Sequence, residues 1–262
     1  YRDGFGPFPP GLERVPYGDA EALEAAITPD TAAFLVEPIQ GEGGIVVPPP
    51  GYLSRCAEIC RRHDVLLIAD EVQTGLGRTG RLLACDHEGV RPDGLILGKA
   101  LGGGLLPVSA FLADRRVMDV FGPGDHGSTF GGNPLAAAVG TEVLALLADA
   151  RPWEHAERLG ERLMTRLRTA ALPCVREVRG RGLLVGVALD PALADAADIA
   201  ERLLARGIAT RDTNGNVIRL APPLVIDEAT LDEAASRIID TLRNHLATRV
   251  ATAPRASVAH MQ

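Results

Sequence analysis

The sequence predicts an α/β fold, with a mostly parallel sheet in a larger first unit and a smaller α+β unit after it. Up to Asn133, short continuous apolar runs alternate with amphipathic stretches, as expected for parallel strands covered by helices on both faces. Beyond Asn133, two long helical patterns precede a strand-rich segment. We therefore predict a large domain at 1–145, a small carboxyl-terminal domain at 146–250 and a disordered tail at 251–262.

Local patterns predict the elements in chain order. Apolar runs bounded by Asp, Pro or Gly predict strands at 32–38, 65–70, 93–99 and 108–114. Apolar residues at three- and four-residue steps predict a helix at 50–63. In the second unit, the patterns predict helices at 134–149, 154–171, 196–206 and 227–247, with the apolar stretch RGRGLLVGVAL and a strand at 217–223 between them.

Composition limits the class of protein. Hydrophobic residues make up 46% and charged residues 23% of the chain, which is typical of a folded globular protein and excludes a mainly disordered one. No apolar run reaches the length of a membrane span and the first residues lack a signal-peptide pattern, so we expect a cytoplasmic protein without membrane partners. The net charge of -7 disfavours nucleic acid as a partner, and the four cysteines lack zinc-type spacing.

The carboxyl ends of the predicted parallel strands carry the chemically active residues. Ligands of open parallel sheets bind beyond these ends. There the sequence places Glu37, Asp70 with Glu71, and Lys99. We therefore expect a carboxylate and a lysine to face one crevice.

Lys99, within LILGKALGGG, is the only lysine of the sequence, whereas arginine is abundant. The simplest alternative is a surface lysine, and an arginine-rich composition explains why lysine is rare elsewhere. Neither explains a lysine at the end of an apolar strand. Arginine stays protonated, whereas a partly desolvated lysine can lose its proton and attack a carbonyl carbon. We therefore predict that Lys99 forms a Schiff base.

The segment GLGRTG, residues 75–80, matches the dinucleotide-binding pattern G-x-G-x-x-G. Such a site needs the glycines directly after the first strand and an acidic residue at the end of the next strand. Here Asp70 and Glu71 precede the glycines, and Asp93 begins the next strand instead of ending it. We interpret the segment as a Gly-rich loop and keep an NAD-binding domain only as an alternative.

A pyridoxal phosphate site explains more of these residues together. It uses a lysine for the aldehyde, a carboxylate at the pyridine nitrogen, polar donors for the phosphate and an arginine for the substrate carboxylate. Asp70 is the candidate for the pyridine nitrogen. Capping of the following turn is its simplest alternative role, but its position at the end of a strand favours the cofactor.

Several motifs resemble the class III, fold-type I, pyridoxal-phosphate-dependent aminotransferases. They are LLIADEVQTGLGRTG, GKALGGGLLPVSA, HGSTFGGNP, VEPIQGEGG and RGRGLL, and the resemblance runs from about residue 1 to 247. It implies the PLP-transferase fold type I. The segments GFGPFPPGLERVPYGD, HGSTFGGNPLA and VIRLAPPLVI most resemble the members that transfer the δ-amino group of ornithine to 2-oxoglutarate, giving glutamate-5-semialdehyde and glutamate.

The resemblance implies roles at the cofactor ring. Lys99 would bind pyridoxal 5'-phosphate covalently and, once released, move a proton of the substrate. Asp70 would pair with the ring nitrogen, and Gln73 would donate to the phenolic oxygen. Val72 would pack on the ring, although an ordinary apolar residue at the end of a sheet is an equal interpretation.

The resemblance also implies a homodimer. Ser128 and Thr129 would reach the phosphate of the cofactor in the neighbouring subunit. Without the resemblance, the same segment would be interpreted as a polar loop before a helix that begins at a proline.

A charge pair is expected to control which substrate group reacts. Arg219 lies within an apolar strand, where a charge needs a partner. By resemblance, Arg219 would bind the substrate α-carboxylate, and Glu42 would neutralise Arg219 while ornithine reacts through its δ-amine. A solvated loop residue is the alternative for Glu42. Arg179 and Arg181 are expected to be structural or surface charges.

The resemblance begins midway through the large domain of the family. The first part of that domain, which holds the cofactor's own phosphate, the stacked aromatic ring and the groups that fix ornithine, is therefore expected to lie outside these residues. We predict an open sheet edge and exposed apolar surface, with a tendency to aggregate. The alternatives that remain are an acetylornithine or other ω-amino-acid aminotransferase, and a noncatalytic truncated homologue that associates with a full-length chain.

Overall fold

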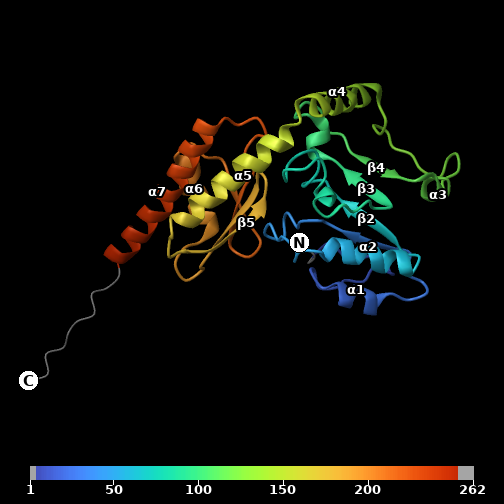
Figure 1. The fold of residues 1–262 in the computed structure, drawn as a ribbon, viewed down its shortest axis with the longest axis horizontal. Helices are drawn as coiled ribbons and strands as arrows, with labels where there is room; N and C mark the ends of the chain where they lie inside the picture. Colours follow the sequence, from blue (N-terminus) through green and yellow to red (C-terminus); the bar gives the residue numbers. More distant parts are fainter. Residues whose placement is uncertain (1–3, 253–262) are drawn as a thin grey trace, which may run out of the picture.

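The computed structural model describes residues 4–252, which form two four-stranded sheets, each with its own helices (Figure 1). Helices α4 (Pro134–Ala150) and α5 (Pro152–Thr169) connect the two parts. No helix of the described part is long and apolar enough to cross a membrane. The predicted tail falls outside the described residues except for its first two positions, which end the last helix.

The first sheet has the order β1-β2-β3-β4 and is mostly parallel, as predicted. Its strands are β1 (Ala33–Val36), β2 (Leu66–Asp70), β3 (Gly94–Leu97) and β4 (Ala110–Ala113). β4 is the exception, because it runs antiparallel to β3. Only the short 3₁₀ helix η2 (Lys99–Gly102) lies between β3 and β4, whereas a parallel pair of strands normally needs a full crossover helix between them.

Helices cover one face of this sheet. α2 (Tyr52–Arg62) packs on Leu67 and is flanked by α1 (Ala20–Ala26). On the opposite face Leu35 is 60% exposed and Phe111 is 42% exposed. The prediction of a sheet covered on both faces is therefore wrong for the described chain, because no described helix packs on that side. The exposed apolar surface that we expected is present.

The second sheet is antiparallel, with the order β5-β6-β8-β7. Its strands are β5 (Val175–Arg181), β6 (Leu184–Leu189), β7 (Arg211–Thr213) and β8 (Val217–Leu220). It packs against α5 and the helices α6 (Ala196–Ala205) and α7 (Glu228–Thr252). The loop around Ile45 covers the other face, so every residue of β6 is buried.

The last strand of the second unit is shorter than predicted, and the predicted start of this unit lies within a helix. The strand expected at 217–223 ends at Leu220, since Pro222 and Pro223 lack the N–H groups that a strand ladder needs. The predicted domain boundary after residue 145 lies inside α4, which continues to Ala150. We propose that the boundary lies at the junction of α4 and α5.

The Gly-rich loop 75–80 joins the two sheets. The Arg78 carbonyl accepts a hydrogen bond from the Leu183 N–H (3.0 Å), and its guanidinium donates to the carbonyls of Leu183 (3.2 Å) and Pro222 (2.5 Å). Burial lowers the pKa of Arg78. Gly182 has a φ of 51°, and a Cβ there would lie 2.5 Å from the carbonyl carbon of Thr79. This loop therefore serves as a domain contact, which agrees with its interpretation as a Gly-rich loop.

Arginines of α5 face acidic residues of α7. Arg158 lies 2.7 Å from Glu228, while Arg162 and Arg166 lie 2.5 and 2.8 Å from Asp232. The hydrogen bond from Arg162, with help from Arg166, lowers the pKa of Asp232 to about 2. These pairs are solvent-exposed, so each contributes little to the free energy of unfolding, and salt weakens each of them further.

We expect Asp232→Asn to lower the thermal unfolding midpoint at neutral pH by about one to three degrees. A carboxylate with a depressed folded-state pKa stabilises the fold above its unfolded pKa of about 4 and loses this effect as pH falls through its folded pKa. The difference from wild type should therefore vanish as pH falls from about 4 to about 2. Circular dichroism melts across this range measure it, with the exposed Glu161→Gln as control. An equal difference at neutral pH and below pH 2 would contradict the assignment.

Candidate active site

The carboxyl ends of β1, β2 and β3 bring Glu37, Asp70 and Lys99 to one edge of the sheet, where the crevice is expected. β2 and β3 are in register at Asp70 and Ile96, so their ends lie at the same edge. Glu37 follows β1, and its carboxylate accepts a hydrogen bond from the Gly41 N–H (2.8 Å). Burial raises the pKa of Glu37, and the nearby Asp70 and Glu42 add to this rise, whereas Lys99 opposes it.

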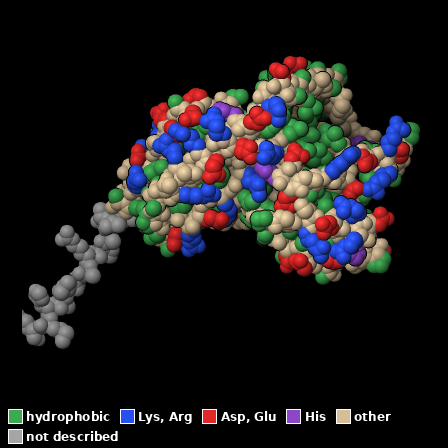
Figure 2. Space-filling view, in the orientation of Figure 1, with side chains coloured by type: hydrophobic (Ala, Val, Ile, Leu, Met, Phe, Trp, Pro, Cys, Tyr) green, Lys and Arg blue, Asp and Glu red, His purple; other side chains and the backbone are tan. Residues whose placement is uncertain are grey.

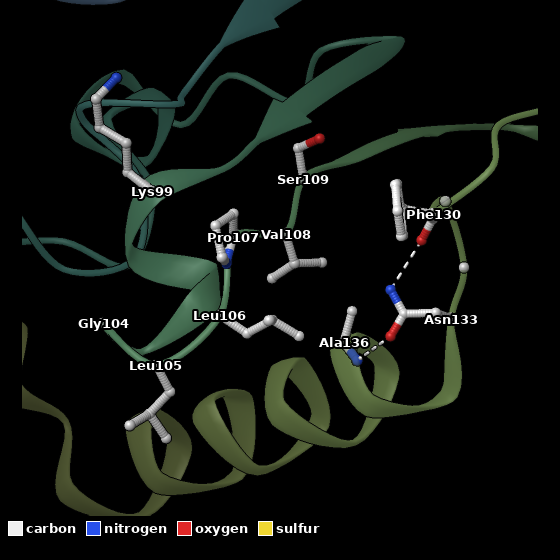
Figure 3. A pocket seen from close by; sticks show the side chains of 12 residues that line it. Lys99, Gly104, Leu105, Leu106, Pro107, Val108, Ser109, Phe130, Asn133 and Ala136 are labelled. Carbon is white, nitrogen blue, oxygen red and sulfur yellow. Dashed lines mark hydrogen bonds between the residues drawn. The ribbon is translucent and has the colours of Figure 1, made fainter.

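Lys99 follows β3 and begins η2, instead of lying in the predicted strand 93–99. Its φ of 38° marks a sharp left-handed turn. Figure 3 shows its side chain pointing away from Leu105 and Leu106. The side chain is exposed and, within residues 4–252, makes no hydrogen bond or ion pair. The expected partial desolvation is therefore absent at the Lys99 side chain in the described chain, although α4 packs against the buried Leu101 of the same turn.

Asp70 and the turn after it lie at the carboxyl end of β2, at the same sheet edge as Lys99. Asp70 Oδ1 accepts a hydrogen bond from the Val72 N–H (3.0 Å), while its Oδ2 has no hydrogen bond within the described chain. The Val72 side chain lies close to Gly98, where a Cβ would stand 3.4 Å from Val72 Cγ1. The Gln73 side chain lies against Gly41, since a Cβ at Gly41 would clash with it.

Glu71 turns away from the crevice and is only 1% exposed. Its carboxylate accepts hydrogen bonds from the Thr74 hydroxyl and from the N–H groups of Ala84 (3.0 Å) and Cys85 (2.8 Å). These bonds connect the turn after β2 to the 3₁₀ helix η1 (Ala84–Glu88). Glu71 therefore supports the position of its neighbours instead of facing a ligand.

Glu42, in the loop after β1, and Arg219, in β8 of the second sheet, form an ion pair. Arg219 Nη1 lies 2.5 Å from Glu42 Oε1 and 3.3 Å from Gln73 Oε1. Gln73 Nε2 donates to the same Glu42 oxygen at 3.4 Å. In the described chain Gln73 thus joins the two charged residues. Its predicted bond to the cofactor remains a prediction.

The loop that carries Glu42 is held by the second sheet. The Thr213 hydroxyl donates to the Glu42 carbonyl (2.7 Å). The Arg179 guanidinium donates to the carbonyls of Gly44 (2.7 Å) and Ile45 (3.0 Å). Sequence reasoning gave Arg179 no functional role and did not single out Thr213. The only signal was the position of Arg179 in RGRGLL, which says nothing about the loop it contacts.

Ser128 and Thr129 lie in an exposed loop before α4. Ser128 Oγ accepts a hydrogen bond from the Gly131 N–H (3.0 Å). Neither residue has a hydrogen bond to Lys99, Asp70 or another candidate site residue in the described chain. Their contact with the phosphate of a second subunit stays a prediction.

An open pocket of about 680 Å³ separates Lys99 from the start of α4 (Figure 3). Asn133 caps this helix, with its Oδ1 accepting from the Ala136 N–H (2.9 Å). Hydrophobic side chains gather below α4 in Figure 2. Two side chains at this pocket, Leu105 and Phe130, are strongly exposed. The pocket is therefore an apolar hollow beside the lysine.

The residues of the crevice fit pyridoxal phosphate at its ring and aldehyde. Lys99 offers a free amine, and Asp70 offers a carboxylate oxygen without a partner. Val72 supplies an apolar surface beside Gly98, a position without a side chain. Among the described residues, no cluster of His, Cys, Asp and Glu could hold a metal ion.

The chain is similar to aminotransferases over most of its length. The family profile described as Aminotransferase class-III matches residues 1–242. The ornithine aminotransferase of Bacillus subtilis (strain 168) is 53% identical over 244 residues, which cover 93% of this chain and 60% of the relative. The ornithine aminotransferase of Bordetella pertussis is 50% identical, covering 92% of this chain and 58% of the relative. This chain spans about 60% of the length of these curated relatives.

Solved structures share the fold. The ornithine aminotransferase from Toxoplasma gondii, crystallized with oxidized glutathione and with partial occupancy of pyridoxal phosphate at its active site, has a TM-score of 0.92 and 50% identity. The match covers 95% of this chain and 59% of that chain. The acetylornithine aminotransferase from Elizabethkingia anophelis has a TM-score of 0.85 and 47% identity, covering 90% of this chain and 63% of that chain.

Proposed function

The chain belongs to the class-III aminotransferase family, and from this we propose that it takes part in transfer of the δ-amino group of ornithine to 2-oxoglutarate. The products are glutamate-5-semialdehyde and glutamate. The observation that carries the proposal is the Glu42–Arg219 pair, which joins the loop after β1 to β8, with Glu37 near enough to Glu42 and Lys99 for both charges to affect its pKa. Pyridoxal phosphate, when bound, supplies an aldehyde for amines and a ring that accepts electrons.

Three side chains are proposed to act at the cofactor. Lys99 attaches it covalently and, as a free amine, accepts and returns the proton of the substrate carbon that carries the amine. Asp70 keeps the ring nitrogen protonated through its free Oδ2. Val72 contacts the ring face. Catalysis needs Lys99 to be less exposed than it is here, so further polypeptide is expected to cover it.

A homodimer is the proposed functional unit. In it, Ser128 and Thr129 contact the cofactor phosphate of the partner subunit. This is supported by their exposed loop beside the apolar hollow under α4.

Glu42 and Arg219 are proposed to select the reacting amine. While they are paired, Arg219 cannot bind the α-carboxylate of ornithine, so the δ-amine is presented instead. When 2-oxoglutarate enters, Arg219 binds its α-carboxylate. The pair is partly desolvated, with the Arg219 side chain 20% exposed, which strengthens a charge-assisted hydrogen bond.

We expect Glu42→Ala to allow ornithine to react through its α-amine. Losing a charge-assisted hydrogen bond should raise the ratio of α- to δ-transfer by about tenfold or more. Product analysis after incubation with pyridoxal phosphate, ornithine and 2-oxoglutarate measures this ratio, and Glu201→Ala on the exposed surface of α6 is the control. An unchanged ratio would contradict the proposed role of the Glu42–Arg219 pair as a gate that selects the reacting amine.

Turnover of ornithine by the chain tests the proposal as a whole. Formation of glutamate and semialdehyde in equal amounts would support it. Turnover of N-acetylornithine but not ornithine would favour the second candidate, which is motivated by the similarity to an acetylornithine aminotransferase. The acetylated α-amine of N-acetylornithine cannot compete with its δ-amine. N-acetylornithine therefore does not need the Glu42–Arg219 pair to select the reacting amine. Association with a longer homologous chain without turnover would favour a noncatalytic role.

A further inference from the structure

Two arginines of the second sheet face each other across β7 and β8. Arg211 and Arg219 are direct partners in the antiparallel register, so their side chains project from the same face. Like charges in such a pair are destabilising unless an anion lies between them. Glu42 provides that anion, with Oε1 2.5 Å from Arg219 Nη1 and Oε2 3.9 Å from Arg211 Nη2.

We propose that Arg211 is a specificity-determining residue that receives the Glu42 carboxylate when a substrate carboxylate occupies Arg219. Glu42 then has two alternative partners, and the gate changes state by moving one side chain between them. This inference rests on the proposed function of Arg219 as a carboxylate site.

The contacts around Glu42 favour a movement of the side chain alone. The Thr213 hydroxyl and the Arg179 guanidinium hold the backbone of its loop. Gly44 fits so closely that a Cβ would lie 2.7 Å from the Asn214 carbonyl oxygen. The loop is therefore tightly docked on the sheet that carries both arginines, and rotation of Glu42 needs no loop displacement.

Exposure differs among the three charged side chains in a way that suits this exchange. Arg219 is 20% exposed, whereas Glu42 is 40% and Arg211 is 56% exposed. Arg219 is thus fixed, while Glu42 and Arg211 have room to approach each other.

The charge balance explains why a second partner is needed. Two guanidinium groups and one carboxylate leave one positive charge, which one substrate carboxylate can neutralise. Without Arg211, the displaced Glu42 would remain unpaired next to the incoming carboxylate. Repulsion between these two anions would then oppose binding.

Isothermal titration calorimetry of the chain with 2-oxoglutarate tests the proposal. We expect Arg211→Gln to weaken binding about three- to five-fold, as for loss of a partly exposed ion pair. Arg176→Gln removes an equally exposed arginine of the same sheet, paired with Asp190, and should leave binding unchanged. In a Glu42→Gln background, Arg211→Gln should have almost no effect, because no displaced carboxylate remains to be paired.

An Arg211→Gln effect that persists in the Glu42→Gln background would overturn the proposal, because Arg211 would then act as a general attractor of anions or as a structural residue. Equal binding by wild type and Arg211→Gln would overturn it as well. By contrast, binding that is unaffected by Arg219→Gln would show that Arg219 is not the carboxylate site. Absence of binding to wild type would show that the chain does not bind 2-oxoglutarate, and in either case the proposed function would fail.

A crystal structure of the Arg219→Gln chain decides the inference independently of substrate binding. We expect the Glu42 carboxylate within hydrogen-bond distance of the Arg211 guanidinium, at about 3 Å. A Glu42 side chain directed into solvent would overturn the proposal even if 2-oxoglutarate binds.

Discussion

Replacement of Lys99 by arginine is expected to abolish covalent attachment of pyridoxal phosphate to the chain. An arginine keeps the positive charge but, at neutral pH, cannot lose a proton and attack the aldehyde of the cofactor. Lys99 is the only lysine, so the amino terminus is the only competing primary amine. Incubation with the cofactor, reduction with borohydride and peptide mass spectrometry would locate the label. We expect it at Lys99 in wild type and a complete loss from that peptide in Lys99→Arg.

A relocated lysine provides the matched control. Arg91 is 87% exposed and lies outside the crevice, so Arg91→Lys in the Lys99→Arg background restores one amine in a different environment. Selective labelling of wild type over this variant would show that position 99 favours the reaction. Equal labelling of both would contradict a dedicated site. A folded wild-type chain without label would favour the noncatalytic alternative, because the exposed Lys99 would then need additional polypeptide.

Replacement of Glu71 by leucine is expected to cause the largest loss of stability. The buried carboxylate accepts from the N–H groups of Ala84 and Cys85 and from the Thr74 hydroxyl. Each unpaired buried donor costs about 1–3 kcal/mol, and partial relaxation would leave a total loss of about 3 kcal/mol in the free energy of unfolding. Urea unfolding at neutral pH measures this difference.

Two variants sharpen the result for Glu71. Glu71→Gln keeps one acceptor oxygen and should lose about half as much stability as Glu71→Leu. Glu58→Leu, on the exposed side of α2, should change stability by no more than about 0.5 kcal/mol. If Glu71→Leu unfolded at the same urea concentration as Glu58→Leu, the carboxylate would not stabilise the turn after β2.

Local patterns were sufficient to locate most elements. The helix predicted at 50–63 is α2, at 52–62, and the strand predicted at 65–70 is β2, at 66–70. Apolar periodicity and bounding Pro or Gly residues are properties of neighbouring residues, so the sequence carries them directly. The direction of the single strand β4 and the lack of a helix over Leu35 depend on how distant segments pack, so local patterns did not specify them.

At the candidate site, too, local patterns predicted the positions along the chain, whereas the contacts between distant segments were not predicted. The sequence indicated that Asp70 and Lys99 follow strand ends, and the structure places both at one edge of the sheet. The sequence did not indicate that Lys99 begins an exposed left-handed turn or that Gln73 contacts Glu42 and Arg219. These contacts depend on the docking of two sheets, which no pattern within one segment encodes. The catalytic roles of these residues remain predictions.

The sequence by itself determined the apolar strands, the charged residues that follow them and the single amine, because these depend on composition and on periodicity along the chain. Only the tertiary structure decided that Glu42 meets Arg219, 177 positions away, with Arg211 beside it. That meeting depends on the contact between the sheets through Arg78 and Gly182. Its physical reason is that an ion pair forms only where packing brings its two charges together, whatever their separation in sequence.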